Sequence, residues 1–221
     1  MIEYDWRFDV IWDYRQVYLR GAQVTIALSL LSVVFATILG LFVALARQSR
    51  SRIVTFISSV YVEFLRNTPL LVQIFWIFYC LPVLVGVSLT AFWSAAVSLA
   101  VHFSAYIAEI IRSGIASIDR GQTDAAKILG FTYGQSMRRI VLPQALRRVL
   151  PPLVNIFADI VKLSSLASVI GVYDLMHSVN NTIMNTFRPL ELYSALAVVY
   201  FVLIYPVAFA ARRFELRMSR Q

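Results

Sequence analysis

The sequence predicts an all-α membrane protein with five transmembrane helices and a further cytoplasmic helix in one connection. Of the 221 residues, 59% are hydrophobic and 14% are charged, whereas a soluble domain carries about 25% charged residues. The charges lie between apolar runs, and a helix of about 20 apolar residues crosses a ~30 Å hydrocarbon core. The mean hydropathy of +0.72 agrees. This composition argues against a soluble globular enzyme.

The five spans are expected in segments bounded by charges or turn residues. The uncharged run 21–46 lies between two arginines, and the 42 uncharged residues 67–108 suffice for two crossings. Proline suits the first turn of a helix because the N–H groups there lack an intrahelical partner, so Pro151 and Pro152 are expected to open the fourth span. The expected spans are about 21–46, 54–80, 89–111, 152–173 and 190–211.

The segments outside these spans are expected to lie on defined sides of the membrane. Residues 1–20 mix acids, arginines and aromatics, which suits an amphipathic external segment at the interface. The apolar run after it is longer than the roughly 7–15 residues of a signal-peptide core, so no cleavage is expected. Residues 212–221 form a basic tail, and 112–150 form a long connection.

The orientation follows from the basic residues of the connections. Fourteen lysines and arginines fall on the side of the long connection and the tail, and four fall on the other side. The Lys- and Arg-rich side faces the cytoplasm, which places the amino terminus outside and the carboxyl terminus inside. The net charge of +8 thus reflects orientation, and no nucleic-acid partner is expected. A single Cys80 and two distant histidines predict neither a disulfide nor a metal site.

The connection 112–150 carries helix punctuation. Thr123 is expected to cap a short helix starting at Asp124, and Gly130 to end it in a left-handed conformation. A second amphipathic piece is expected over 133–140, ending before Pro143. Small residues on the first helix would let a partner protein approach its backbone. An interfacial helix resting on lipid headgroups is an equally good interpretation of these features alone.

The spacing in this connection resembles the Glu-Ala-Ala signature of importer-type ABC transporter permeases. In that family the loop forms a coupling helix that docks in a cleft of the ATP-hydrolysing subunit. Here Asp124 stands where the family has Glu, which keeps the charge on a shorter side chain. The resemblance implies ATPase coupling for Gly121, Asp124, Ala125, Ala126, Gly130, Ile140, Leu142 and Pro143.

Three further segments resemble the polar amino-acid branch of these permeases: 61–73, 108–122 and 162–171. The family often has Asp directly after the lysine of the last segment, whereas this chain has Leu163. Only residues 1–18 fall outside the resemblance. It implies a type I ABC importer permease fold.

Polar residues within the spans are candidates for a substrate path. A charge at mid-bilayer costs about 2.5–3.5 kcal/mol even on insertion scales, so it faces protein or water. Asp159 and Lys162 are three residues apart on one helix face, together with Asn155. They either meet the charged groups of an amino acid or form a structural pair, and an Asp159 that faces the substrate would favour cationic or neutral side chains. The candidate path residues are Asn155, Asp159, Lys162, Ser164, Ser165 and His102.

Two other charged pairs are expected to be structural. Glu63 and Arg66, and likewise Glu109 and Arg112, are three residues apart near the cytoplasmic surface. The sequence contains no Gly-x-x-x-x-Gly-Lys-Ser/Thr segment for ATP and no Ser/His/Asp constellation. The chain is therefore expected to be a non-catalytic subunit.

The resemblance implies import of a polar amino acid into the cytoplasm by alternating access. The implied partners are two ATP-binding subunits that hold ATP and Mg²⁺, a second identical or homologous permease subunit, and a periplasmic or lipid-anchored amino-acid-binding protein. The implied location is the bacterial inner membrane, with lipid around the spans.

The alternative is an ion-coupled secondary carrier or channel subunit with Asp159 or Glu109 as its ion site. Such a carrier predicts inverted repeats, and the five spans show none. A membrane enzyme is a third option, disfavoured by the missing catalytic set.

Overall fold

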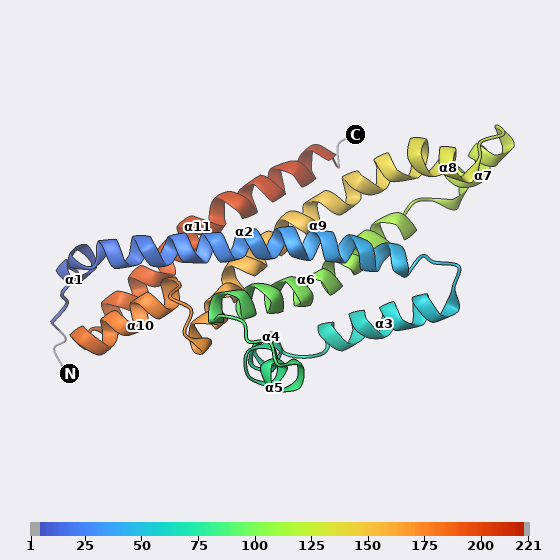
Figure 1. Cartoon of the computed structure of the whole chain (residues 1–221). Coiled ribbons are helices and arrows are strands. Elements are labelled where there is room, and N and C mark those ends of the chain that lie inside the picture. The colour runs from blue at the N-terminus through green and yellow to red at the C-terminus, as the bar shows by residue number, and fades with distance from the viewer. Residues whose placement is uncertain (1–4, 219–221) are drawn as a thin grey trace.

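The computed structural model describes residues 5–218, and every regular element in this part is helical. The long helices lie side by side along the long axis of the molecule (Figure 1). Four continuous helical stretches are long and apolar enough to cross a membrane, and a bent pair makes a fifth if it counts as one span. The long helices are α2 (Arg15–Ala46), α6 (Ala91–Ala116), α9 (Leu142–Leu163) and α11 (Pro189–Met218).

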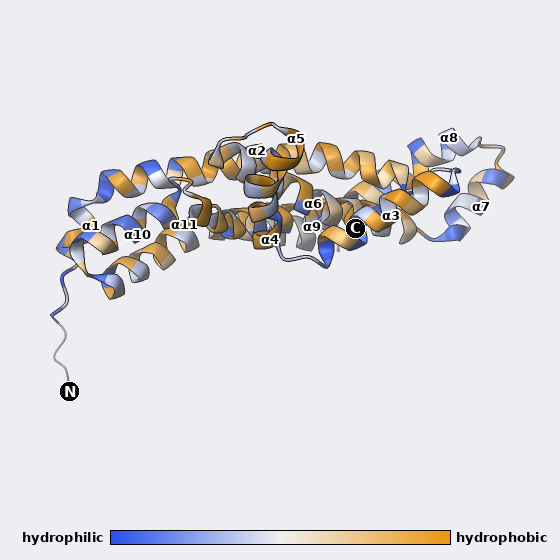
Figure 2. Ribbon diagram, turned by 60° about the horizontal axis from the view of Figure 1, so that its bottom comes forward, coloured by the Kyte–Doolittle hydropathy of each residue, from blue (hydrophilic) through white to orange (hydrophobic). Residues whose placement is uncertain are grey.

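Short helices lie at both ends of this bundle. At one end are α1 (Asp9–Asp13) and α10 (Leu175–Thr186), and at the other are α7 (Arg120–Ile128) and α8 (Tyr133–Ser136). The middle of the molecule is predominantly apolar, and hydrophilic residues gather towards the two ends (Figure 2). The bilayer therefore surrounds the middle of the bundle.

The second span is broken, and its prediction as one helix over 54–80 is wrong. Helix α3 (Arg52–Arg66) is separated by three residues from a second stretch, and the two are bent by 107°. Pro69 has no N–H to donate and disfavours the helical conformation of Thr68 before it. The second stretch lies crosswise to the long helices (Figure 1). It contains α4 (Leu70–Phe75), a π-helical turn η1 (Trp76–Cys80) and α5 (Leu81–Val85).

The fourth span starts far earlier than the predicted residue 152. Helix α8 continues through a π-helical turn, η2 (Met137–Val141), into α9, so the helical stretch runs over Tyr133–Ile170. Pro151 and Pro152 lie inside α9. Prolines are tolerated inside membrane helices because neighbouring groups satisfy the freed carbonyls. The 3₁₀ segment η3 (Ser164–Ile170) ends the stretch.

The predicted boundaries at the two ends also shift. Helix α2 begins at Arg15, so the expected external segment 1–20 does not end at a helix start, and residues 1–4 lie outside the described residues. Helix α11 continues past residue 211 to Met218. Of the expected tail, Arg220 lies outside the described residues. Helix α10, in the expected external connection, was not predicted because its pattern of small polar residues resembles a loop.

A stripe of small residues brings α2 and α6 close together. The stripe recurs every three or four residues along α2 and is buried. A Cβ atom on Gly40 would lie 2.8 Å from Cβ of Ile107 and 2.9 Å from the Ser104 carbonyl oxygen, so only glycine fits there. Small residues allow such close packing between membrane helices. The stripe consists of Gly21, Thr25, Ser29, Ser32, Ala36, Gly40 and Ala44.

The end of the bundle that holds α1 and α10 contains a buried acid, Asp174, which caps α10. Oδ1 of Asp174 accepts a hydrogen bond from the His177 N–H at 2.9 Å, and the Leu175 N–H donates to Oγ1 of Thr25 on α2 at 3.1 Å. Asp174 is fully buried, and its Oδ2 has no hydrogen-bond partner among the described residues. Burial raises the pKa of the Asp174 carboxyl from its ordinary 3.8 to about 7.

This shift makes the stability of the α10 end of the bundle pH-sensitive. The unfolded chain loses the Asp174 proton near pH 4 and the folded chain only near pH 7, so the stabilisation present below pH 4 is lost as the pH rises to about 7. We predict that Asp174→Asn, which keeps a good cap without charge, removes most of this slope, on the order of 2–4 kcal/mol between pH 4 and 8. Thermal unfolding of the protein in nanodiscs at several pH values measures it. Asp119→Asn at the exposed cap of α7 is the matched control, and an unchanged slope in Asp174→Asn contradicts the prediction.

Candidate functional site

The short helix α7, at the tip of the bundle that also holds α8, starts earlier than the sequence predicts. Its cap is Asp119, whose Oδ1 accepts from the Gly121 N–H at 2.7 Å, whereas the Thr123 hydroxyl donates to the Arg120 carbonyl. The predicted Thr123 cap is therefore wrong. Gly130 has a φ of 78°, the left-handed conformation expected after the helix. Its N–H donates to the Lys127 carbonyl oxygen at 2.9 Å.

The eight residues expected to couple to an ATPase lie in two places: five at the tip and three in the helical stretch that follows α8. Ala126 is buried against the body of the tip, while Asp124 is exposed and pairs with Lys127 at 2.9 Å. Gly121, Ala125 and Gly130 are exposed on the same tip. Ile140, Leu142 and Pro143 belong to the continuous stretch η2–α9, so the predicted end of a helix before Pro143 is wrong. Pro143 lies in the first turn of α9, where its missing N–H costs little.

Three apolar residues at this tip were missed by the sequence analysis. Ile128, Leu129 and Tyr133 are 86%, 73% and 79% exposed. They lie around the end of α7 and the start of α8, at the extreme end of the molecule and away from its apolar middle (Figure 2). In the sequence, these apolar residues follow the last polar turn of the helix, and that position is the signal that could have identified them. Adjacent exposed apolar side chains in water are typical of a protein interface.

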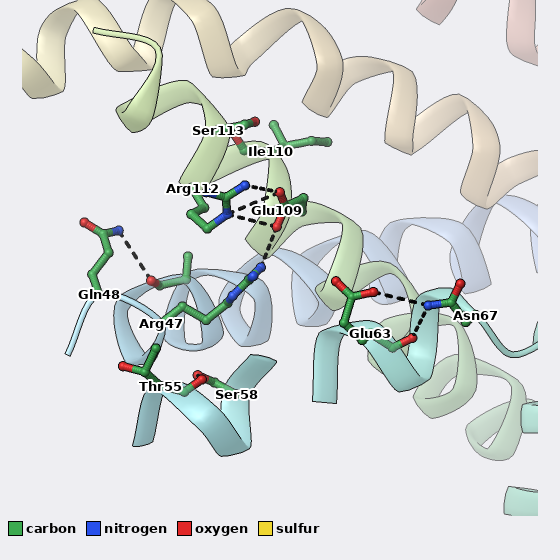
Figure 3. A network of polar contacts seen from close by, with 11 residues as sticks. Arg47, Gln48, Thr55, Ser58, Glu63, Asn67, Glu109, Ile110, Arg112 and Ser113 are labelled. Carbon is green, nitrogen blue, oxygen red and sulfur yellow. Dashed lines mark hydrogen bonds and ion pairs between the residues drawn. The ribbon is translucent and has the colours of Figure 1, made fainter. Parts of the chain in front are cut away.

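A three-membered ion cluster joins α2 to α6 near the same end (Figure 3). Nη1 of Arg47 lies 2.5 Å from Oε2 of Glu109. The Arg112 guanidinium also pairs with Glu109, with Nε 3.1 Å from Oε2. The expected neighbours Glu109 and Arg112 are thus in contact, and Arg47 is an additional member from 62 residues away.

The other expected pair does not form. Within residues 5–218 no ion pair joins Glu63 to Arg66, because Glu63 accepts from Nδ2 of Asn67 at 3.2 Å (Figure 3). The Arg66 guanidinium instead lies over the Tyr106 ring, 5.5 Å from its centre. Residues three apart on a helix can meet, but the bend after Arg66 offers each of them another partner.

The expected substrate-path residues of α9 lie on one partly exposed face. Lys162 Nζ is 3.1 Å from Oδ1 of Asp159, and the side chains are 56% and 49% exposed. Asn155 is exposed one turn away. The hydroxyls of Ser164 and Ser165 donate to carbonyl oxygens of their own helical stretch, those of Val161 and Lys162. The two serines are thus satisfied locally.

A hollow of about 580 Å³ lies beside the break of the second span. The break contributes Arg66, Asn67 and Thr68 to its lining, and α6 contributes His102 and Tyr106. His102 is buried, with Nδ1 3.2 Å from Oε1 of Gln73. Of the six candidate path residues, only His102 lines this hollow.

Residues 36–220 match the family of binding-protein-dependent transport system inner membrane components. The chain belongs to this family. Its relatives include the probable glutamine ABC transporter permease protein GlnM of Bacillus subtilis (strain 168), 36% identical over 96% of this chain and 97% of the relative. The glutamine transport system permease protein GlnP of Escherichia coli (strain K12) is 35% identical over 99% of both chains.

Solved structures support the same family. A chain in the crystal structure of an amino acid ABC transporter with histidines has a TM-score of 0.92 and 36% identity, over 97% of this chain and 100% of that chain. A chain of the inward-facing MetNI methionine ABC transporter, at 22% identity and a TM-score of 0.77 over 93% and 98% of the two chains, shows the fold alone. The family resemblance and the all-α permease fold predicted from the sequence are confirmed, and the protein is a multi-pass permease subunit of an importer-type ABC transporter.

The ion cluster of this permease makes a testable contribution to stability. We predict that Glu109→Gln lowers the free energy of unfolding by roughly 1–3 kcal/mol, because the variant loses charge-assisted bonds to Arg47 and Arg112. Glu63→Gln is the matched control, since the Glu63 side chain accepts a hydrogen bond from Asn67 and forms no ion pair within residues 5–218. Denaturant unfolding of the chain in nanodiscs measures both variants. Equal losses for the two glutamates would contradict the role given to the cluster.

Proposed function

We propose that this permease subunit imports a polar amino acid into the cytoplasm by alternating access. Two such subunits, identical or homologous, would enclose the path. Two separate ATP-binding subunits would supply the energy and hold ATP and Mg²⁺, and a periplasmic or lipid-anchored binding protein would deliver the amino acid. The amino-acid permeases among the relatives support this substrate class. The inward-open and outward-open conformations both exist before ATP binds, and ATP binding shifts the population from one to the other.

The observation that carries the proposal is the polar face of α9. The Asp159–Lys162 pair is about half exposed on a helix that is apolar enough to cross the membrane. Charged groups at membrane depth face protein or water because contact with lipid is costly. This face is therefore suited to a second permease subunit or to the solute path between two of them. Asn155 and the pair would line that path.

The exposed tip is suited to an ATP-binding partner. Leu129 and its apolar neighbours would enter a cleft of that partner, and the Asp124–Lys127 pair would lie at its rim. The helical stretch Tyr133–Ile170 connects the tip to the polar face of α9 without a chain break. The Lys- and Arg-rich connections support a cytoplasmic location for the tip, an external amino terminus and a cytoplasmic carboxyl terminus.

Reconstitution tests this function. The chain is co-expressed with its candidate ATP-binding and binding-protein partners and placed in proteoliposomes, and uptake of labelled amino acids is measured with and without internal ATP. We expect uptake of at least one polar amino acid that requires ATP and the complete complex. Uptake by the permease chain alone, driven by an ion gradient, would instead support a secondary carrier and overturn the proposal.

The tip makes a sharper prediction. We expect Leu129→Ser to reduce co-purification of the ATP-binding subunit by tenfold or more, because it removes a largely exposed apolar anchor from the interface. The amount of ATP-binding subunit bound per permease, measured after affinity purification, checks this.

The matched control for this change is Tyr173→Ser, which removes another exposed large residue just beyond the outer end of the same helical stretch. It should leave the ATP-binding subunit bound. Normal co-purification with Leu129→Ser, or equal losses for both variants, would show that the tip is not the docking surface.

A further inference from the structure

We propose that a cavity within the tip receives an aromatic side chain with a polar end, a tyrosine or a tryptophan, from the ATP-binding subunit. The cavity has a volume of about 300 Å³ and lies between α7 and the stretch α8–η2, which are neighbours at the tip (Figure 1). Its lining includes Phe131, Tyr133, Ser136 and Met137, and we call it the tip cavity. The inference rests on the proposed function and names a contact that the partner makes there.

A buried serine hydroxyl lines the tip cavity. Ser136 is 7% exposed, and its Oγ has no hydrogen-bond partner among the described residues. The hydroxyl of Thr123, on the opposite wall, is already bonded, because it donates to the Arg120 carbonyl oxygen at 2.7 Å. Buried polar groups in folded proteins are nearly always bonded, since an unsatisfied one is costly. The Ser136 hydroxyl is therefore suited to bond a polar atom that enters the cavity.

The remaining lining suits an aromatic ring. Phe131 and Tyr133 bring rings to the cavity, Met137 brings a thioether and Val141 brings a branched apolar side chain. Aromatic rings pair favourably with one another and with methionine sulfur. The Arg139 guanidinium lies over the Phe131 ring, 6.0 Å from its centre, and helps to hold that ring in place. A volume of about 300 Å³ is at the lower end of the range for ligand sites, which fits a single ring.

The charge at the cavity favours a neutral group. Lys127 contributes to the lining, and its Nζ lies 2.9 Å from Oδ1 of Asp124. An anionic side chain would compete with Asp124 for this ammonium group, and a cationic side chain would be repelled by Lys127. Tyrosine and tryptophan combine an apolar ring with a neutral hydrogen-bonding end. They can therefore fill the cavity and bond Ser136 without breaking the existing ion pair.

The position of the cavity indicates that the ring belongs to a docked protein. Tyr133 lines the cavity and also belongs to the exposed apolar group of the tip, together with Ile128 and Leu129. The cavity and that surface are thus continuous, so a partner that covers the surface also reaches the cavity. Tyrosine and tryptophan are enriched among the residues that dominate interface affinity, and such residues fill pockets of the partner. Contact would then run in both directions, with Leu129 entering the partner and the partner's ring entering the tip.

One substitution separates this role from a structural one. We expect Ser136→Ala to weaken binding of the ATP-binding subunit about fivefold or more, because it leaves the partner's polar atom without a bond. The same change should not lower the thermal stability of the permease alone, since the hydroxyl has no partner among the described residues. Binding is measured by titrating the permease in nanodiscs with the purified ATP-binding subunit. Ser113→Ala is the matched control, because the exposed Ser113 bonds the Ile110 carbonyl oxygen and does not line the cavity.

A double-mutant cycle identifies the side chain that occupies the cavity. Each tyrosine and tryptophan in the docking cleft of the ATP-binding subunit is replaced by phenylalanine, alone and together with Ser136→Ala. For the residue that enters the cavity, the single change should weaken binding about fivefold or more. The double variant should bind at least as tightly as either single variant, because removing both partners of a hydrogen bond leaves no group unsatisfied.

Three results would overturn the proposal. They are unchanged binding in Ser136→Ala, a loss of thermal stability that accompanies the loss of binding, and additive losses for every tyrosine and tryptophan tested. If Leu129→Ser still removes the ATP-binding subunit and the complete complex takes up amino acids with ATP, the proposed function stands and only the role of the tip cavity is rejected. A complete complex that transports no amino acid would reject the proposed function itself.

Discussion

The close packing of α2 against α6 is the constraint on which the rest of the structure depends. Lipid is as apolar as leucine, so membrane helices associate through van der Waals contact and polar bonds. The small-residue stripe of α2 supplies that contact, and Gly40 allows the backbones to approach at Ile107. The Arg47–Glu109 pair joins the same two helices at one end, and Thr25 holds α10 to α2 at the other. Because α6 is fixed in this way, His102 and Tyr106 form a rigid wall for the hollow.

The broken second span leaves open space beside the rigid helix α6. A continuous helix over 54–80 would fill the space beside α6, whereas the bend after Arg66 exposes backbone and polar side chains there. Gln73 compensates for the break by bonding two of the carbonyls around it. The polar lining of this hollow therefore comes from an interruption of a helix, and the buried amide of Gln73 braces that interruption.

The sequence predicted the membrane helices and the family better than it predicted the places where helices break. The apolar run 21–46 lies within α2, and the spacing around Asp124 led to the correct family. Proline was ambiguous: Pro69 breaks a span, while Pro151 and Pro152 lie inside one. A spacing of three residues also did not determine partners, since Glu109 meets Arg112 and Glu63 does not meet Arg66. Arg47 has no local sequence signal, because its partner is 62 residues away.

The π-helical turn η2 has a geometric consequence for the helical stretch that contains it. The 38 residues of Tyr133–Ile170 form a rod about 57 Å long at 1.5 Å per residue. A π turn accommodates one residue more than an α turn, and each α-helical residue advances the rod by about 100°. Deleting a single residue of Met137–Val141 would therefore rotate the Asp159 face by more than a quarter-turn relative to the tip. The π-helical turn thus sets the rotation of the Asp159 face relative to the tip, measured about the axis of the helical stretch.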